Sequence, residues 1–384
     1  MANKEFLKIS NEIKNLDISS CIDNLYFYSY HNKYLQKLQK SNPDKQDPHF
    51  ISTYSSFVGE VYENVIYELL LQYCFNNEDI TSFVLKGPHQ DNYENLKNGL
   101  MIDKNSQIVY KAGYKDVTEF DALFFTKSSV CFVESTIVKT TTSLRKRLKK
   151  KKALLEFLFP KLKVRALIVL SQGAMGVNVF PNYCKVWVTK PLQNKPLIDE
   201  LIFNNKKNKS FNKFNNKKLI YSHNIKIAPF KYFDNILWLL KNIRKDKKNI
   251  LDFKFLKSKK VLKYFEIYSK FYIGHINSDI FVRLLKFLNI RSISEDIELQ
   301  NIQDDQIIVT IEQNGNGYVL IYYLKINNDK LKKLEIIDDT LAVSNKDPKG
   351  FTASETKYIK YIFKKSYKLS LEDIKTILLK PEFN

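Results

Sequence analysis

The chain has few cysteines, glycines and prolines, and each shortage excludes a class of protein. Its 384 residues include only 4 cysteines, none in a C-x-x-C pair. They are Cys21, Cys74, Cys131 and Cys184, all in apolar contexts, so we predict buried thiols rather than a disulfide framework or a zinc site. With 10 glycines and 10 prolines, the composition is typical of a folded chain, not of a disordered or fibrous one.

Long apolar runs and common enzyme motifs are also missing. No apolar run reaches roughly 18 residues, so the sequence predicts no transmembrane helix. The first residues lack the apolar segment of a signal peptide, and we expect a cytoplasmic protein with no membrane partner. The sequence has no P-loop, no G-x-G-x-x-G and no G-x-S-x-G, and its five histidines show no metal-ligand spacing. These absences argue against an NTPase, a dinucleotide enzyme and a serine hydrolase.

Basic residues are in clear excess. The chain has 62 lysines and arginines against 41 acidic residues, a formal net charge of +21. A proteome with AT-rich codons would enrich lysine and asparagine, but it would not remove acidic residues. Such a field attracts polyanions, and we expect nucleic acid rather than a membrane surface because no segment looks membrane-directed.

The composition divides the chain into four parts. Residues 1–50 are polar with helical stretches, and residues 51–200 alternate helices and strands. Residues 201–220 contain an asparagine- and lysine-rich run, Asn204–Lys218, which predicts a linker or loop. Residues 221–384 are predicted to form a separate α+β region, and no chemical motif marks its role.

Hydrophobic periodicity predicts an α/β layer structure for the second part. Apolar residues at three- and four-residue steps predict a long helix over Tyr54–Phe75, and Ser143–Phe159 is predicted as a second helix. The run Val164–Ser171 has few charges, as a central parallel strand would. Further strands are predicted at Ser82–Lys86, Gly99–Asp103, Gln107–Lys111, Thr118–Phe125, Val130–Thr136, Val177–Phe180 and Lys185–Thr189.

The last part is predicted to combine helices with one hairpin. Asn314-Gly315-Asn316-Gly317 is a strong turn signal between two strands, Gln306–Glu312 and Gly317–Ile326. Helices are predicted at Phe233–Ile243, Lys259–Phe271, Ser278–Leu288, Ser354–Phe363 and Ser370–Leu379.

Two carboxylates lie in a hairpin within the second part. Asp121 falls in the apolar strand Thr118–Phe125, and Glu134 falls near the end of the next strand. A short turn joins the strands, so the two acids can lie close together. Buried like charges at short range are unfavourable unless a cation lies between them. Mg²⁺ (or Mn²⁺) prefers one or two carboxylates plus water and phosphate oxygens, and the hairpin therefore predicts such a site.

The acids belong to a longer pattern. A G-x-x-x-E helix segment contains Gly59 and Glu63, Glu119-Phe120-Asp121 lies on a strand, and Val133-Glu134-Ser135-Thr136 ends the next strand. This arrangement resembles the PD-(D/E)XK nuclease superfamily over about residues 53–190. The resemblance implies a restriction-endonuclease-like mixed sheet flanked by helices. It also implies Mg²⁺-dependent hydrolysis of phosphodiester bonds, in DNA more than in RNA, in a restriction or defence setting.

The resemblance also assigns roles to residues. Asp121 and Glu134 would be metal ligands, Glu63 would complete the site, and the Ser135 carbonyl and Glu119 would contribute further oxygens. Thr136 stands where the family has a lysine, and it cannot carry a charge. The candidates to replace that lysine are Lys139, just past the strand, and Lys149 and Lys150 on the following helix.

That helix is strongly basic. Seven of eight residues from Arg145 to Lys152 are lysine or arginine. A charge run of this kind is often only a solvated face, but its position directly after the acids favours phosphate binding. The predicted nucleic-acid contacts are Arg145, Lys146, Lys149, Lys150 and Lys152.

Three hypotheses follow. The first is a metal-dependent nuclease, and the retained Asp121 and Glu134 favour it. The second is a nucleic-acid-binding protein that keeps the nuclease fold without catalysis, and Thr136 favours it. The third is an interaction protein whose charge reflects proteome bias alone. A homodimer is compatible with the first, because nucleases that cut both strands often dimerise.

Overall fold

The computed structural model describes the chain in two stretches. The first is residues 18–221, apart from 41–43, 91–92, 94, 113–114, 177–179, 193 and 205–216. The second comprises 262–263, 266–267, 270–293, 307–314, 317–326, 330–337, 339–343 and 368–379. The chain divides into two compact units, residues 1–231 and 232–384, and each is described by itself.

The main sheet of the first unit is mixed, as predicted for an α/β protein. Its strand order is β8-β7-β6-β5-β1-β9. β6 runs parallel to β7, and β7 runs parallel to β8, which confirms the central parallel strand; β5 is antiparallel to β6, which confirms the hairpin. The strands are β1 Ser82–Val84, β5 Ala122–Phe125, β6 Ser129–Thr136, β7 Lys163–Ser171, β8 Cys184–Thr189 and β9 Leu219–Ile220.

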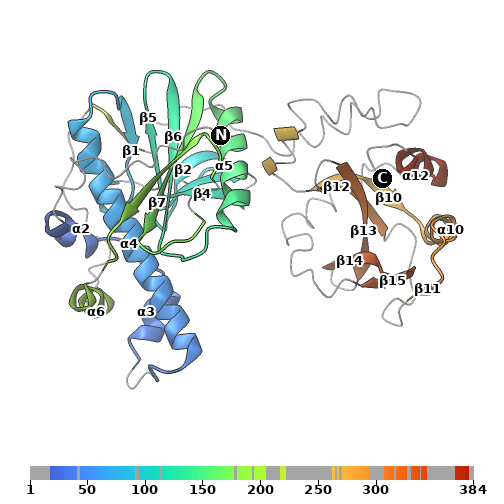
Figure 1. Cartoon of the computed structure of the whole chain (residues 1–384), viewed down its shortest axis with the longest axis horizontal. Helices are drawn as coiled ribbons and strands as arrows, with labels where there is room; N and C mark the ends of the chain where they lie inside the picture. Colours follow the sequence, from blue (N-terminus) through green and yellow to red (C-terminus); the bar gives the residue numbers. More distant parts are fainter. Residues whose placement is uncertain are drawn as a thin grey trace. The chain divides into compact units, whose positions relative to one another are not determined.

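One long helix, α4 (Pro48–Asn76), covers one face of this sheet (Figure 1). It begins where the Asp47 side chain accepts a hydrogen bond from the His49 amide and Pro48 occupies the first turn, an arrangement that favours helix initiation. Its apolar stripe packs against the odd-numbered side chains of β6, Cys131 and Val133. The predicted helix over Tyr54–Phe75 is therefore confirmed and extends further toward the N-terminus.

Successive side chains of a strand point to opposite faces of a sheet, so the even-numbered side chains of β6 point away from α4. On that other face lie α5 (Leu144–Leu158) and a second, three-stranded sheet. The second sheet has the order β2-β3-β4, and the ring of Phe120 on β4 lies 6.1 Å from that of Phe132 on β6. Its strands are β2 Asn98–Ile102, β3 Ile108–Ala112 and β4 Lys115–Phe120.

The sequence prediction of one continuous strand over Thr118–Phe125 was wrong. β4 ends at Phe120 and β5 begins at Ala122, and the two strands belong to different sheets. Asp121 is the bend between them. The apolar pattern ran through the break because both strands bury side chains, and periodicity alone does not mark where a chain changes sheets.

Short helices complete the first unit. They are η1 Ile18–Cys21, α2 Ile22–Leu25, α3 Asn32–Leu38, η2 Gly87–His89 and α6 Lys195–Phe203. The predicted linker at 201–220 is structured at both ends. Its first three residues belong to α6, and its last two form β9, which pairs with β1 in the main sheet. Residues 177–179 of the predicted strand Val177–Phe180 and the middle of the linker lie outside the described residues, and Phe180 lies in a bend.

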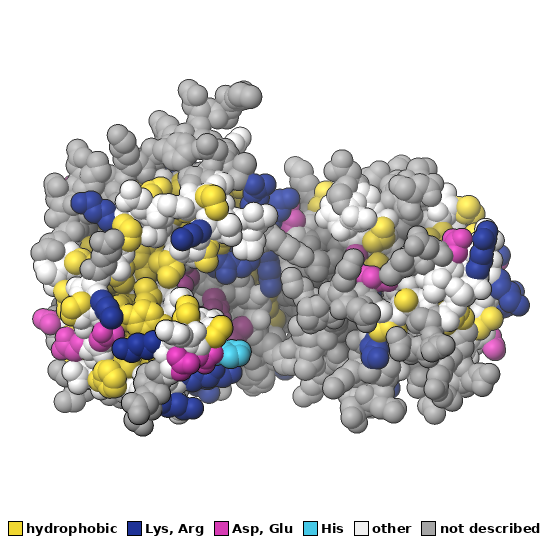
Figure 2. Space-filling model, turned by 60° about the horizontal axis from the view of Figure 1, so that its bottom comes forward, with side chains coloured by type: hydrophobic (Ala, Val, Ile, Leu, Met, Phe, Trp, Pro, Cys, Tyr) yellow, Lys and Arg dark blue, Asp and Glu magenta, His cyan; other side chains and the backbone are white. Residues whose placement is uncertain are grey.

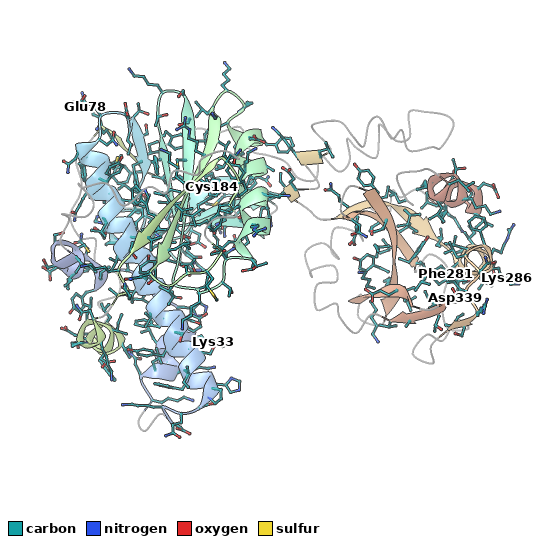
Figure 3. The ribbon with its side chains drawn as sticks, viewed as in Figure 1. Lys33, Glu78, Cys184, Phe281, Lys286 and Asp339 are labelled. Carbon is teal, nitrogen blue, oxygen red and sulfur yellow. The ribbon has the colours of Figure 1, made fainter. Side chains whose placement is uncertain are left out.

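The second unit has its own six-stranded sheet, ordered β10-β12-β13-β14-β15-β11. Asn314 pairs with Gly317, which confirms the predicted hairpin. In Figure 3, Phe281 points from α10 into the core of this unit, whereas Lys286 points away from it. The elements are β10 Lys270–Ile276, α10 Ser278–Phe287, β11 Ser292–Ile293, β12 Ile307–Asn314, β13 Gly317–Ile326, β14 Lys330–Ile337, β15 Thr340–Val343 and α12 Leu371–Leu378.

Two of the helices predicted in this unit are confirmed, α10 for Ser278–Leu288 and α12 for Ser370–Leu379. The helices predicted at 233–243 and 354–363 lie outside the described residues, as does most of the one predicted at 259–271, whose last two residues begin β10. None of the helices in the described parts is long and apolar enough to cross a membrane.

Candidate active site at the end of strand β6

Asp121 occupies the bend between the two sheets, beside the end of β6. Ala122 pairs with Val133 in an antiparallel register, so the preceding residue, Asp121, lies beside the last residues of β6. Asp121 Oδ2 accepts hydrogen bonds from the Ser135 amide at 2.5 Å and from Ser135 Oγ at 3.0 Å. This pairing fixes the carboxylate beside the carboxyl end of β6 and leaves Oδ1 without a described hydrogen bond.

Glu63 lies on α4, and burial and the charge of Asp121 both contribute to a raised pKa of its carboxyl group. The pKa of Glu63 is raised to about 8: burial is the largest cause, the negative charge of Asp121 adds to the rise, and Lys86 and Lys151 oppose it. Among the described residues Glu63 forms no ion pair or hydrogen bond through its side chain. An ionised Glu63 would therefore be repelled by Asp121 in a half-buried place, which is the situation that a bound cation would relieve.

Glu134 is arranged differently from the prediction. It points to the α5 face of the sheet, whereas the next residue, Ser135, binds Asp121. Glu134 is 2 % exposed and forms ion pairs with Lys151 and, at 3.2 Å, with Arg147 Nη2. The charge of Glu134 is thus balanced by α5, and the structure does not place Asp121 and Glu134 as an unbalanced pair around one cation.

Lys151 is the buried centre of this charge cluster. It is 6 % exposed, and its Nζ lies 5.5 Å from the centroid of the Phe120 ring. Burial lowers the pKa of Lys151, and the charges of Asp121, Glu119 and Glu63 oppose that fall. Lys151 therefore brings positive charge close to the three carboxyl groups of Asp121, Glu119 and Glu63.

Sequence reasoning missed Lys151, although a signal was present. Leu144, Leu148, Leu155 and Leu158 form the apolar seam of α5, and all four are buried. Residue 151 completes this seam, at three residues after Leu148 and four before Leu155. A lysine on the buried stripe of a helix indicates a charged partner inside the fold.

Lys86, directly after β1 and Leu85, is a second buried lysine that sequence reasoning missed. It is 7 % exposed, and among the described residues it forms no ion pair. Burial lowers its pKa, and the charges of Asp121 and Glu63 oppose this most strongly. Its Nζ lies 5.0 Å from the Tyr67 ring centroid, and its amide donates to Tyr67 Oη at 2.7 Å.

A buried polar network on α4 supports the segment that carries Lys86. Glu68 accepts hydrogen bonds from Tyr28 Oη at 2.7 Å and from Asn24 Nδ2 at 2.9 Å, and its Oε1 lies 2.6 Å from His89 Nε2. Gly87 has φ of +65°, and a Cβ there would overlap the Tyr28 ring. The loop after β1 is therefore tied to α4 and α2, and the position of Lys86 follows from that attachment.

The remaining predicted site residues lie at the margin. Glu119 on β4 is exposed, and partial burial of its carboxyl raises its pKa while Lys151 lowers it. Lys139 is exposed in the segment after β6, and its carbonyl accepts a hydrogen bond from the Met175 amide. Thr136 Oγ1 accepts from the Val138 amide at 3.3 Å. Within the described residues, the Lys139 side chain forms no ion pair with the carboxyl cluster.

The carboxyl cluster offers few ligands for a metal ion. No group of three His, Cys, Asp or Glu side chains among the described residues has the geometry of a metal site. The five-ligand set expected from the sequence is therefore not assembled there. A smaller set fits the chemistry of Mg²⁺, because Glu63 and Asp121 supply two carboxylates and Mg²⁺ takes its other ligands from water and phosphate.

The basic residues of α5 divide into exposed and paired groups. Arg145 and Lys149 are exposed, as a phosphate-binding surface requires. Lys152 Nζ instead lies 2.6 Å from Glu156 Oε1, and Lys150 is half-buried. The side chain of Lys146 lies outside those described. Of the five predicted nucleic-acid contacts, Arg145 and Lys149 are the two exposed ones with no described partner.

Comparison with protein-family models, with curated proteins and with solved structures finds no match for this chain.

Proposed function

We propose that this protein is a metal-dependent nuclease that hydrolyses phosphodiester bonds in nucleic acid, with DNA as the preferred substrate, in a restriction or defence setting. One observation carries the proposal: burial and the charge of Asp121 disfavour the ionised form of Glu63, in a half-buried place flanked by two buried lysines. Such a site favours a divalent cation together with an anionic substrate. The mixed sheet with α4 and α5 on opposite faces is compatible with a restriction-endonuclease-like core.

Each group has a role in this proposal. Glu63 and Asp121 would hold Mg²⁺ or Mn²⁺, which when bound lowers the pKa of a water and neutralises phosphate charge. Lys86 and Lys151 provide positive charge for the phosphate and for the transition state. Ser135 orients Asp121 through two hydrogen bonds. Arg145 and Lys149 bind the nucleic-acid backbone beside the site.

A cleavage assay tests the proposal. Plasmid DNA, single-stranded DNA and RNA are incubated with the protein in Mg²⁺, Mn²⁺ or EDTA, beside Asp121→Asn, Glu63→Gln and the surface control Glu78→Gln. We expect metal-dependent cutting that falls by about 10²-fold or more in both site variants and is unchanged in the control. Cutting that persists in EDTA or in both site variants would contradict the assignment.

A second candidate is a nucleic-acid-binding protein without catalysis. The observation that favours it is the ion pairing of Glu134 with Lys151 and Arg147, since these contacts occupy a carboxylate that the family uses for metal. Thr136 in place of the lysine points the same way. Salt-sensitive DNA binding without cutting in any metal, retained in Asp121→Asn, would support this candidate over the nuclease.

A further inference from the structure

A groove lies on the first unit, between α3, the first half of α4, and α6. Its volume is about 950 Å³, near the upper end of small-molecule sites. Hydrophobic side chains are gathered on the face of this unit that Figure 2 brings forward. The lining residues used below are Phe50, Tyr54 and Val58 of α4, Ile198 and Ile202 of α6, and three lysines, Lys40, Lys45 and Lys195.

The apolar floor comes from one stripe of α4. Phe50, Tyr54 and Val58 recur every four residues, so they lie on one face of the helix. The rings of Phe50 and Tyr54 are stacked, with centroids 6.4 Å apart. Ile198 and Ile202 of α6 repeat the same spacing opposite them, and Gln39 after α3 bonds to the Ile202 carbonyl. Both isoleucines are buried and close the groove from the α6 side, whereas the half-buried Phe50, Tyr54 and Val58 leave apolar surface open to a ligand.

The charge of the groove selects an anion. Lys40, Lys45 and Lys195 are exposed, and among the described residues none of them forms an ion pair. Asp199 is the one acidic residue in the lining; burial raises the pKa of the neighbouring Tyr54, and the charge of Asp199 adds to that rise. The first turn of α6, Lys195 and Pro196, also borders the groove and adds the positive end of a helix dipole. Three cations against one anion on an apolar floor match a ligand of opposite sign with an apolar body.

We propose that this groove binds a small organic anion whose apolar body lies on Phe50 and Tyr54 and whose acidic group meets Lys40, Lys45 and Lys195. The groove belongs to the first half of α4, before Glu60 and Glu63, so it is distinct from the carboxyl cluster. The proposal does not depend on nuclease activity.

A pair of fluorescent probes tests this site in the full chain. 8-Anilinonaphthalene-1-sulfonate carries a sulfonate on an aromatic body, and N-phenyl-1-naphthylamine has the same body without charge. We expect saturable binding of both, and weakening of about tenfold for the sulfonate alone in the triple variant K40A/K45A/K195A. Val58→Arg, which places a bulky charge on the floor, should weaken both probes.

Controls keep the test specific. The triple variant K104A/K127A/K161A removes three exposed lysines elsewhere on the same unit and should bind both probes as the unaltered protein does. Circular dichroism and a melting curve confirm that each variant is folded. The proposal fails if the sulfonate shows no saturable binding, if both triple variants weaken it equally, or if Val58→Arg leaves both probes bound.

Discussion

Glu63 is a carboxyl group whose surroundings disfavour its charge. Its pKa is raised to about 8, above the value of an unfolded chain. The folded state therefore keeps a proton that the unfolded state loses, so Glu63 lowers stability progressively as pH rises from its unfolded pKa to about 8. Above about pH 8 the loss of free energy of unfolding caused by Glu63 has reached its full value and no longer changes with pH.

Glu63→Gln should remove this loss. At pH 9 we expect the variant to exceed the unaltered protein by about 1–3 kcal/mol in free energy of unfolding, and at pH 4 the two should agree. Urea unfolding at the two pH values measures the difference, with Glu78→Gln as the exposed control. Equal stability of the variant and the unaltered protein at pH 9 would show that the fold does not disfavour the charge of Glu63.

The ion pair of Glu134 and Lys151 is the second residue-scale feature. Both side chains are buried, and removing one leaves an uncompensated charge in the interior. We expect Lys151→Met and Glu134→Gln each to cost about 3 kcal/mol, while the double variant costs clearly less than the sum. A double-mutant cycle by chemical denaturation measures the coupling, and additive costs would mean that the pair contributes no net interaction.

At the element scale, the loop after β1 depends on a residue without a side chain. Gly87→Ala would force an L-residue to a φ of +65° and push a methyl group into Tyr28. We expect a loss of about 2 kcal/mol or more. Gly59→Ala, in the middle of α4 with open space around it, is the matched control and should gain about 0.5–1 kcal/mol. A similar loss in both variants would contradict this account of the loop.

The basic face of α5 makes a separate prediction. If Arg145 and Lys149 contact phosphates, the slope of log K for DNA binding against log salt should fall by about 0.9 for each removed side chain. Arg145→Ala, Lys149→Ala and the exposed control Lys161→Ala are compared by fluorescence anisotropy between low and moderate salt. An unchanged slope in both test variants would place the DNA elsewhere.

The elements show what the sequence could and could not predict. The helices α4 and α5 and the hairpin of β5 and β6 followed from apolar periodicity, because one buried face leaves a regular pattern. The break at Asp121 did not, since a bend between two buried strands keeps that pattern. Lys151 was read as part of a charge run, because seven neighbouring bases concealed its place on the buried seam. The burial of Lys86 could not be predicted, because it depends on the contact between the loop after β1 and α4, and no local sequence pattern indicates that contact.

On the scale of the whole molecule, the described residues of the candidate site all belong to the first unit. Its side chains come from α4, the loop after β1, the bend at Asp121, β6 and α5, all before residue 231. We expect a fragment of residues 1–231 to fold and to retain divalent-metal binding, as measured by circular dichroism and titration calorimetry. A folded fragment that has lost metal binding would show that residues 232–384 contribute to the site.

The most direct test of the central claim is a calorimetric titration of Mn²⁺ into the full chain across pH 6–9. Glu63 must lose its proton to bind metal, so the affinity should rise with pH and level off near pH 8, following the raised pKa. Asp121→Asn and Glu63→Gln should each weaken binding by about tenfold or more, and Glu78→Gln should not. Binding that is absent, or equally strong in both site variants, would contradict the assignment of Glu63 and Asp121 as metal ligands.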